Sequence, residues 1–242
     1  MRQGFCLRFV IGAIAVFALI GASSTDTLVQ LYREPKLQLS GFHITFLLNA
    51  LKSDTMAPFV AIVAILPFSG NYVDEVKSKF ARFSMLRTNY SVYLLGRIIV
   101  CFLLGGAVIL AGVWAAYFVS VLTFLPMEKA ANTEVNQFPA LIEQCVILFL
   151  NGGFWAVLGM TMSTVMESKY IAYASPFVVY YLLVMLYERY FPKAYLIYPR
   201  EWLNPSEKWP MGTWGVAIFL LELTALLGLI FYRRGKRRLE QL

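Results

Sequence analysis

Few residues in this sequence have the type and spacing that catalysis or metal binding requires. His43 is the single histidine, and three cysteines, Cys6, Cys101 and Cys145, are scattered through apolar stretches, so no multi-histidine or paired-cysteine metal site is indicated. No run has the G-x-x-x-x-G-K-[ST] spacing that holds nucleotide phosphates, and no G-x-S-x-G motif marks a nucleophilic serine. The sequence therefore predicts a chain that is not an enzyme and binds no cofactor or metal directly.

Glu222 is the exception, because it lies in the middle of the otherwise uncharged residues 211–232. An acidic group is costly in hydrocarbon and marks a functional site by default. Three interpretations stay open: a neutral or hydrogen-bonded glutamate facing a neighbouring helix, a group lining a substrate path, or a site of ion coupling. The candidate neighbours for the first interpretation are Asn151, Tyr180 and Tyr181, and Asn151 is itself a candidate for the substrate path or a buried polar contact.

The elements that must position these residues are long apolar runs. Of the 242 residues, 59% are hydrophobic and only 14% are charged, whereas soluble domains average about 25% charged residues. A helix that crosses the bilayer needs roughly 17 to 25 mainly apolar residues. The sequence therefore predicts an all-α integral membrane protein, with one domain over residues 1–242 and six transmembrane helices at residues 7–25, 55–73, 97–122, 144–166, 170–188 and 211–232.

Two apolar stretches allow more than one interpretation. Residues 37–51 are too short for a confident crossing, so they are a re-entrant or interfacial segment, or an extension of the second helix. The first run has the basic start and small residues of a signal peptide. An even number of spans brings both tails to one side, which favours a retained first helix.

The distribution of charge predicts the orientation. With both termini in the cytoplasm, the cytoplasmic segments hold thirteen basic and four acidic residues, whereas the outer segments hold eight basic and nine acidic ones. This asymmetry predicts a multi-pass protein of the cell membrane with cytoplasmic N and C termini. The basic tail that begins at Arg233 predicts contact with anionic membrane lipids and not with nucleic acid.

Smaller features predict how the helices pack. Small residues at close-packing spacing, such as Gly152 with Ala156 and Gly159 with Ser163, predict contacts between helices. Aromatic residues in the outer segments favour a belt at the membrane interface over contacts with an exported substrate, and they include Tyr195, Tyr198 and Trp202.

Residues 74–89, between the second and third spans, have the pattern of a short amphipathic helix. Apolar residues recur at steps of three and four, acidic residues lie at the start, and basic residues follow on other faces. Such a helix would lie along the cytoplasmic surface; a solvated loop helix would have the same composition. The residues that would make its contacts are Asp74, Glu75, Lys79, Phe80, Arg82, Phe83, Leu86 and Arg87.

The six-span layout and this segment together resemble the membrane subunit of type-2 ABC transporters, the ABC-2 permease family. The similar residues are Glu75, Lys79-Phe80-Ala81-Arg82-Phe83, Leu86-Arg87-Thr88, Tyr93-Leu94-Leu95 and Arg97. Arg97 stands where lysine is more usual, and Lys77-Ser78-Lys79 where a small residue and glycine are frequent. The layout covers nearly the whole chain, whereas the motif covers about 25 residues.

The resemblance implies a permease subunit that forms the substrate path of an ATP-driven exporter. The segment 74–89 would be a coupling helix docked on a separate ATP-binding subunit, present in two copies, which uses ATP and Mg²⁺. Phe80 and Phe83 would be the apolar anchors, and Arg82 and Arg87 the polar contacts. A second permease subunit, identical or related, would complete the transporter. The alternative from another class is an ion-coupled secondary carrier that uses Glu222; a membrane-embedded enzyme would lack convergent catalytic groups.

Overall fold

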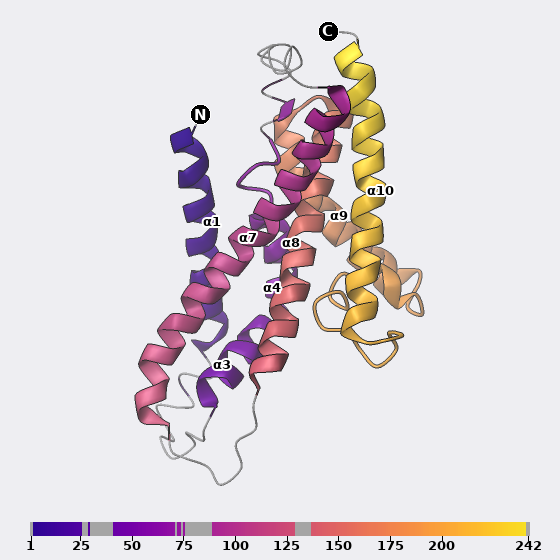
Figure 1. The fold of residues 1–242 in the computed structure, drawn as a ribbon. Helices are drawn as coiled ribbons and strands as arrows, with labels where there is room; N and C mark the ends of the chain where they lie inside the picture. Colours follow the sequence, from indigo (N-terminus) through magenta and orange to yellow (C-terminus); the bar gives the residue numbers. More distant parts are fainter. Residues whose placement is uncertain are drawn as a thin grey trace.

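The computed structural model describes residues 2–25, 29, 41–70, 72–73, 75, 89–128 and 137–240. Within these residues the chain is all-helical and has no strand (Figure 1). The α-helices are α1 (Arg2–Ser23), α3 (Phe42–Leu51), α4 (Met56–Val63), α7 (Tyr90–Phe124), α8 (Phe138–Met166), α9 (Lys169–Arg189) and α10 (Thr213–Glu240), with short 3-10 helices η2 (Leu125–Met127) and η3 (Tyr195–Ile197).

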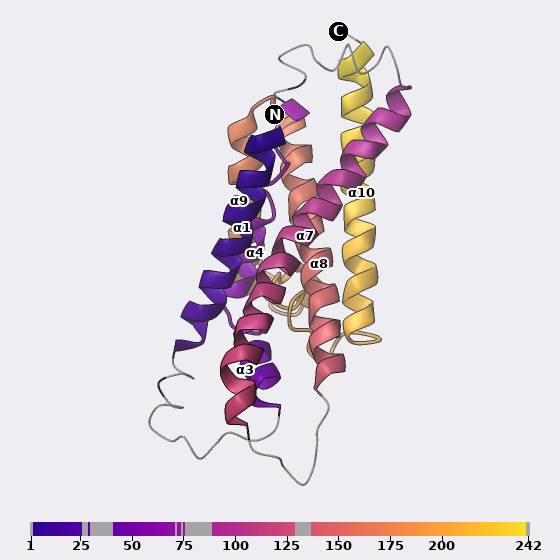
Figure 2. The same cartoon turned by 60° about the vertical axis from the view of Figure 1, so that its left-hand side comes forward.

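The helices have the length and composition of membrane spans. In the described part of the chain, α7, α8, α9 and α10 are each long and apolar enough to cross a bilayer, and the bent pair of α3 and α4 raises the number to five if it is one span. The apolar part of α1, Leu7–Ser23, is shorter. The chain is therefore a multi-pass membrane protein. Both ends of the described chain lie at the same end of the bundle (Figures 1 and 2).

The second expected span is not one continuous helix. α4 ends at Val63 and residues 64–70 form turns, although the sequence predicts a helix through residue 73. Pro67 explains this end, because proline has no N–H to donate to the carbonyl of Val63 and its ring clashes there. Within the apolar stretch 37–51, the structure describes residues 41–51, and α3 is not a straight extension of this span either, since α3 and α4 meet at 75°. Six of the ten residues of α3 are buried, so it packs into the bundle.

α8 forms the centre of the bundle and packs against α4, α7, α9 and α10. In the most apolar 18-residue stretch of α8, 78% of the residues are buried, whereas in the corresponding stretch of α9 only 17% are buried. Gly105 of α7 lies against α8 so closely that an added Cβ would be 2.4 Å from the Cβ of Ala156. A Cβ on Gly159 would be 2.7 Å from the carbonyl oxygen of Ala172 in α9. The predicted small-residue contacts between helices are therefore confirmed at these positions.

The connection between α9 and α10 folds back onto α8. Trp202 is only 2% exposed, its indole N–H donates to the carbonyl oxygen of Leu196 at 2.9 Å, and its ring packs against Phe154 and Trp155. The prediction that Trp202 lies at the membrane interface is wrong. Its ring fills the bundle core, because the connection satisfies the polar indole N–H internally.

Candidate functional site

Four residues, which we call the Glu75 cluster, meet where α7 begins: Phe68, Glu75, Tyr93 and Arg97. The Glu75 carboxylate accepts a hydrogen bond from the Tyr93 hydroxyl at 2.8 Å and pairs directly with the Arg97 guanidinium. The guanidinium also lies 5.2 Å from the ring centres of both Phe68 and Tyr93. The charged pair is therefore enclosed by aromatic rings, with the two side chains 17% and 11% exposed.

The start of α7 positions two members of this cluster. Asn89 is extended and the helix begins at Tyr90, so Tyr93 and Arg97 fall in its first two turns. They are four residues apart and therefore lie on one face. Glu75 comes from the segment that precedes α7, and the pair joins this segment to the helix. Such an arrangement can transmit a displacement from one element to the other, and it includes no group placed for catalysis.

The structure places only part of the predicted coupling segment. Glu75 is buried and contacts α7, so it is directed toward the bundle. The other predicted contact residues lie outside the described residues, and their role stays a prediction: Asp74, Lys79, Phe80, Arg82, Phe83, Leu86 and Arg87.

Glu222 lies on an exposed face of α10. Of the three interpretations, the first, in which Glu222 packs against Asn151 or the tyrosines of α9, is therefore wrong within this chain. At 100° per residue, Glu222 lies nearly opposite the buried positions Leu220 and Thr224, which contact the bundle. Its side chain is therefore directed away from the core of this chain. A role in a substrate path, or in ion coupling, stays a prediction.

Asn151 is buried, in agreement with one of its two predicted roles. It is 1% exposed, and neither its amide nitrogen nor its oxygen has a hydrogen-bond partner among the described residues. Gln144, two turns earlier on the same face of α8, donates to the carbonyl oxygen of Leu203 at 3.1 Å. An unpaired buried amide is unfavourable by about 1 to 3 kcal/mol. Asn151 is thus a buried polar residue whose side chain has no partner among the described residues of the bundle core.

The opposite end of α7 holds a second cluster, which we call the Glu128 cap. The Glu128 carboxylate accepts hydrogen bonds from the backbone N–H groups of Gly41 at 3.0 Å and His43 at 2.8 Å, and it contacts the His43 ring at 2.6 Å. Burial raises the pKa of Glu128, but the hydrogen bonds from His43 and Gly41 outweigh it and lower the pKa below its usual value. Thr45 donates to the Gln137 side chain at 2.7 Å. α3 is therefore tied to the end of α7 and the start of α8.

Sequence reasoning missed the Glu128 cap. Gly41 has a φ of 85°, a left-handed conformation that glycine adopts without strain, and it directly precedes α3. A glycine before an apolar run was a signal for a helix start. The partner, however, lies 85 residues away from His43, and no local pattern connects them.

No group of three histidine, cysteine or acidic side chains in the described part of the chain could hold a metal ion. A scan against protein-family models finds no match to this sequence, and searches of curated proteins and of solved structures find none either.

Proposed function

We propose that this chain is the membrane-spanning permease subunit of an ATP-driven transporter of the type-2 ABC kind, acting in export. A separate ATP-binding subunit, in two copies, hydrolyses ATP with Mg²⁺, and the permease binds no nucleotide itself. The observation that carries the proposal is the Glu75 cluster, which joins the motif-bearing segment to the first turns of α7.

The packing of α7 gives this cluster a mechanical role. α7 is 35 residues long, about 52 Å at 1.5 Å per residue, and it crosses the bundle at a steep tilt (Figures 1 and 2). Gly105 and Gly152 bring its backbone close to that of α8. A displacement of the segment before α7 would therefore reach the central helix as movement of a rigid rod.

Six spans with cytoplasmic termini fit this function. The shared position of the two chain ends supports an even number of crossings, and α1, the bent pair and the four long helices together would give six. The exposed Glu222 supports a second permease subunit, because a charge in mid-span is costly against lipid. Contact with a second subunit would remove that exposure. This position also disfavours an ion-coupled carrier with its path through a single chain.

The decisive experiment is recovery of the ATPase with the tagged full-length chain from its own membranes. The wild type should copurify a P-loop ATPase that hydrolyses Mg-ATP. Phe80→Ala with Phe83→Ala should lose it, because each central anchor contributes about 2 kcal/mol or more. The matched control is Phe118→Ala with Phe177→Ala, which removes two exposed aromatic rings elsewhere on the bundle.

The control should retain the ATPase and reach the membrane at the same abundance as the wild type. Failure to recover any P-loop ATPase with the wild type, or its full retention by the double variant, would contradict the proposal. Transport that continues without ATP and stops when the ion gradient is collapsed would instead establish the carrier.

A further inference from the structure

An apolar groove lies between α7 and α10. Its volume is about 630 Å³, and its lining includes Leu95 and Phe102 from α7 and Ala225 and Leu229 from α10. Its one threonine, Thr224, donates its hydroxyl to the carbonyl oxygen of Leu220 at 2.7 Å. The groove therefore offers contacts to hydrocarbon and no unpaired hydroxyl to a polar ligand.

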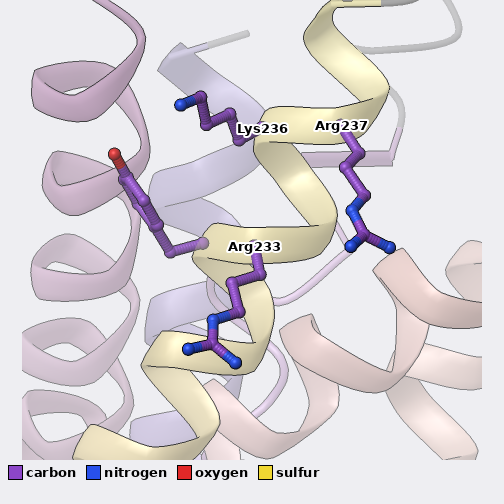
Figure 3. A pocket seen from close by; sticks show the side chains of 4 residues that line it. Arg233, Lys236 and Arg237 are labelled. Atoms are coloured by element: carbon purple, nitrogen blue, oxygen red, sulfur yellow. The ribbon is translucent and has the colours of Figure 1, made fainter.

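A basic pocket adjoins this groove at the C-terminal part of α10. Arg233, Lys236 and Arg237 line it with Tyr232, and its volume is about 450 Å³. Figure 3 shows the three basic side chains spreading from α10, with Arg233 one turn below the other two. Tyr232 lines both the groove and the pocket, so the two form one continuous surface.

Some polar groups where the groove meets the basic pocket have partners within the described part of the chain, and others make no ion pair there. The Tyr232 hydroxyl lies 2.8 Å from the hydroxyl of Ser91 at the start of α7, which fixes the ring at the boundary. Arg238 pairs with Glu167 and faces another direction. Arg233 and Arg237 are exposed and make no ion pair with any residue that the structure describes. Two guanidinium groups are thus available to an anion at the end of the groove.

The dimensions of the surface match those of a lipid. From Tyr232 to Leu221 α10 rises about 16 Å at 1.5 Å per residue, close to half of the roughly 30 Å hydrocarbon core. The cationic pocket lies at the headgroup end of this length. An acyl chain would fill the groove while its phosphate stays at the level of the arginines.

We propose that this surface binds one anionic glycerophospholipid from the adjacent leaflet, with an acyl chain in the groove and the phosphate at Arg233, Lys236 and Arg237. The lipid bridges α7 and α10, because both helices line the groove. This site does not depend on the proposed transport function.

The test is lipid retention by the purified full-length protein in native mass spectrometry. Phosphatidylglycerol and phosphatidylcholine with the same acyl chains are offered separately, and soluble glycerol 3-phosphate is the third arm. The wild type should retain phosphatidylglycerol about tenfold or more strongly than phosphatidylcholine, since each basic residue near the phosphate favours the anionic lipid. It should retain glycerol 3-phosphate weakly.

Two variants test separately how the basic charge and the apolar groove contribute to lipid retention. Arg233→Gln should reduce phosphatidylglycerol retention about fivefold or more, whereas the adjacent Arg234→Gln, which removes the same charge from an exposed residue outside the pocket, should leave it within twofold. Ala225→Phe should fill the groove and lower retention of both lipids. All of these positions are exposed, and size-exclusion chromatography checks that each variant folds.

Equal retention of the two lipids would overturn the proposal, and so would equal losses in Arg233→Gln and Arg234→Gln. Retention of glycerol 3-phosphate as strong as that of phosphatidylglycerol would identify a site for a soluble phosphate and would overturn it as well.

Discussion

The two ends of α7 are each held by a glutamate, but the glutamates use different partners. At the first end, Glu75 pairs with the side chains of Arg97 and Tyr93. At the other end, Glu128 accepts two backbone N–H groups from the start of α3 as well as the ring of His43. The first joint depends on side-chain charge, whereas the second satisfies the unpaired donors at a helix start.

This difference fits two mechanical roles in the proposed transporter. An ion pair between two side chains can move with either segment that carries it. The Glu75 cluster would therefore transmit a displacement of the segment before α7 to α7 itself. The Glu128 cap holds α3 in a fixed position, and Thr45 extends the same tie to Gln137 at the start of α8. α7 would then act as a lever with a driven end and an anchored end.

Reversing the charge of Arg97 should have the largest effect on this comparison. Arg97→Glu would leave two carboxylates among aromatic rings, and breaking a buried pair costs about 3 to 5 kcal/mol. We expect a large loss of folded protein, measured by monodispersity and thermal unfolding in detergent. Glu75→Arg combined with Arg97→Glu should restore part of it.

The control for this change is Arg189→Glu, an exposed residue at the end of α9, which should unfold like the wild type. If Arg97→Glu were as stable as this control, the Glu75 cluster would not hold the driven end of α7.

Removing the Glu128 carboxylate should have a smaller effect, confined to the anchored end. Glu128→Ala leaves the N–H groups of Gly41 and His43 unpaired, and the loss of a helix cap costs about 0.5 to 2 kcal/mol. Hydrogen exchange of the first amides of α3 should accelerate, while amides at the start of α7 stay protected.

Glu143→Ala is the matched control, because Glu143 is an exposed acid in the second turn of α8. Equal acceleration of exchange at both ends of α7 after Glu128→Ala would show that the two joints are not independent.

The sequence predicts apolar helices of the bundle but not the partners that meet at the two ends of α7. The apolar runs predict both ends of α9 to within one residue and the end of α8, because burial in lipid requires long uncharged helices, whereas α8 begins six residues before the predicted span. Glu75 and Arg97 belong to the segment that resembles the ABC-2 permease family, but nothing in their spacing predicts that they pair. The Glu128 cap uses backbone N–H groups, which nearly every residue carries, so its partner could not be found without the tertiary structure.

Two errors have the same physical origin. The interpretation in which Glu222 faces a neighbouring helix rests on the cost of an exposed charge, but a single helix does not fix which of its faces packs against the bundle. Trp202 was expected at the interface because indoles favour it, but a folded connection supplied a partner for its N–H. Composition determines that a residue needs a partner, and packing determines which partner it finds.

Tyr93→Phe should separate the hydrogen bond of the Glu75 cluster from its ion pair. The variant loses the 2.8 Å bond to Glu75 but keeps the ring beside Arg97. We expect a loss of about 1 kcal/mol in stability, seen as a small fall in the thermal unfolding midpoint. Ser91→Ala, which removes an exposed contact with Tyr232, should have less effect, and a larger fall for Ser91→Ala would contradict this ranking.

The smallest expected effect is the pH dependence of the anchored end. It reflects only how much the site stabilises the charged form of Glu128 relative to the neutral form. Hydrogen bonds from His43 and Gly41 lower the pKa of Glu128 in the folded protein despite its burial. A carboxyl group with a lowered folded pKa contributes stability that is fully present above its ordinary pKa of about 4.3. That contribution is lost as the pH falls through the folded pKa.

Glu128→Gln keeps an oxygen acceptor but has no charge to lose. The stability of the wild type minus that of Glu128→Gln, measured by unfolding in detergent, should therefore shrink as the pH falls below about 4. Acidic groups that do not contact Glu128 titrate alike in both proteins, so they cancel in the difference. A difference that stays flat or grows with acidification would mean that the backbone N–H groups hold the Glu128 side chain without preferring its charged form, and that the anchored end depends on geometry alone.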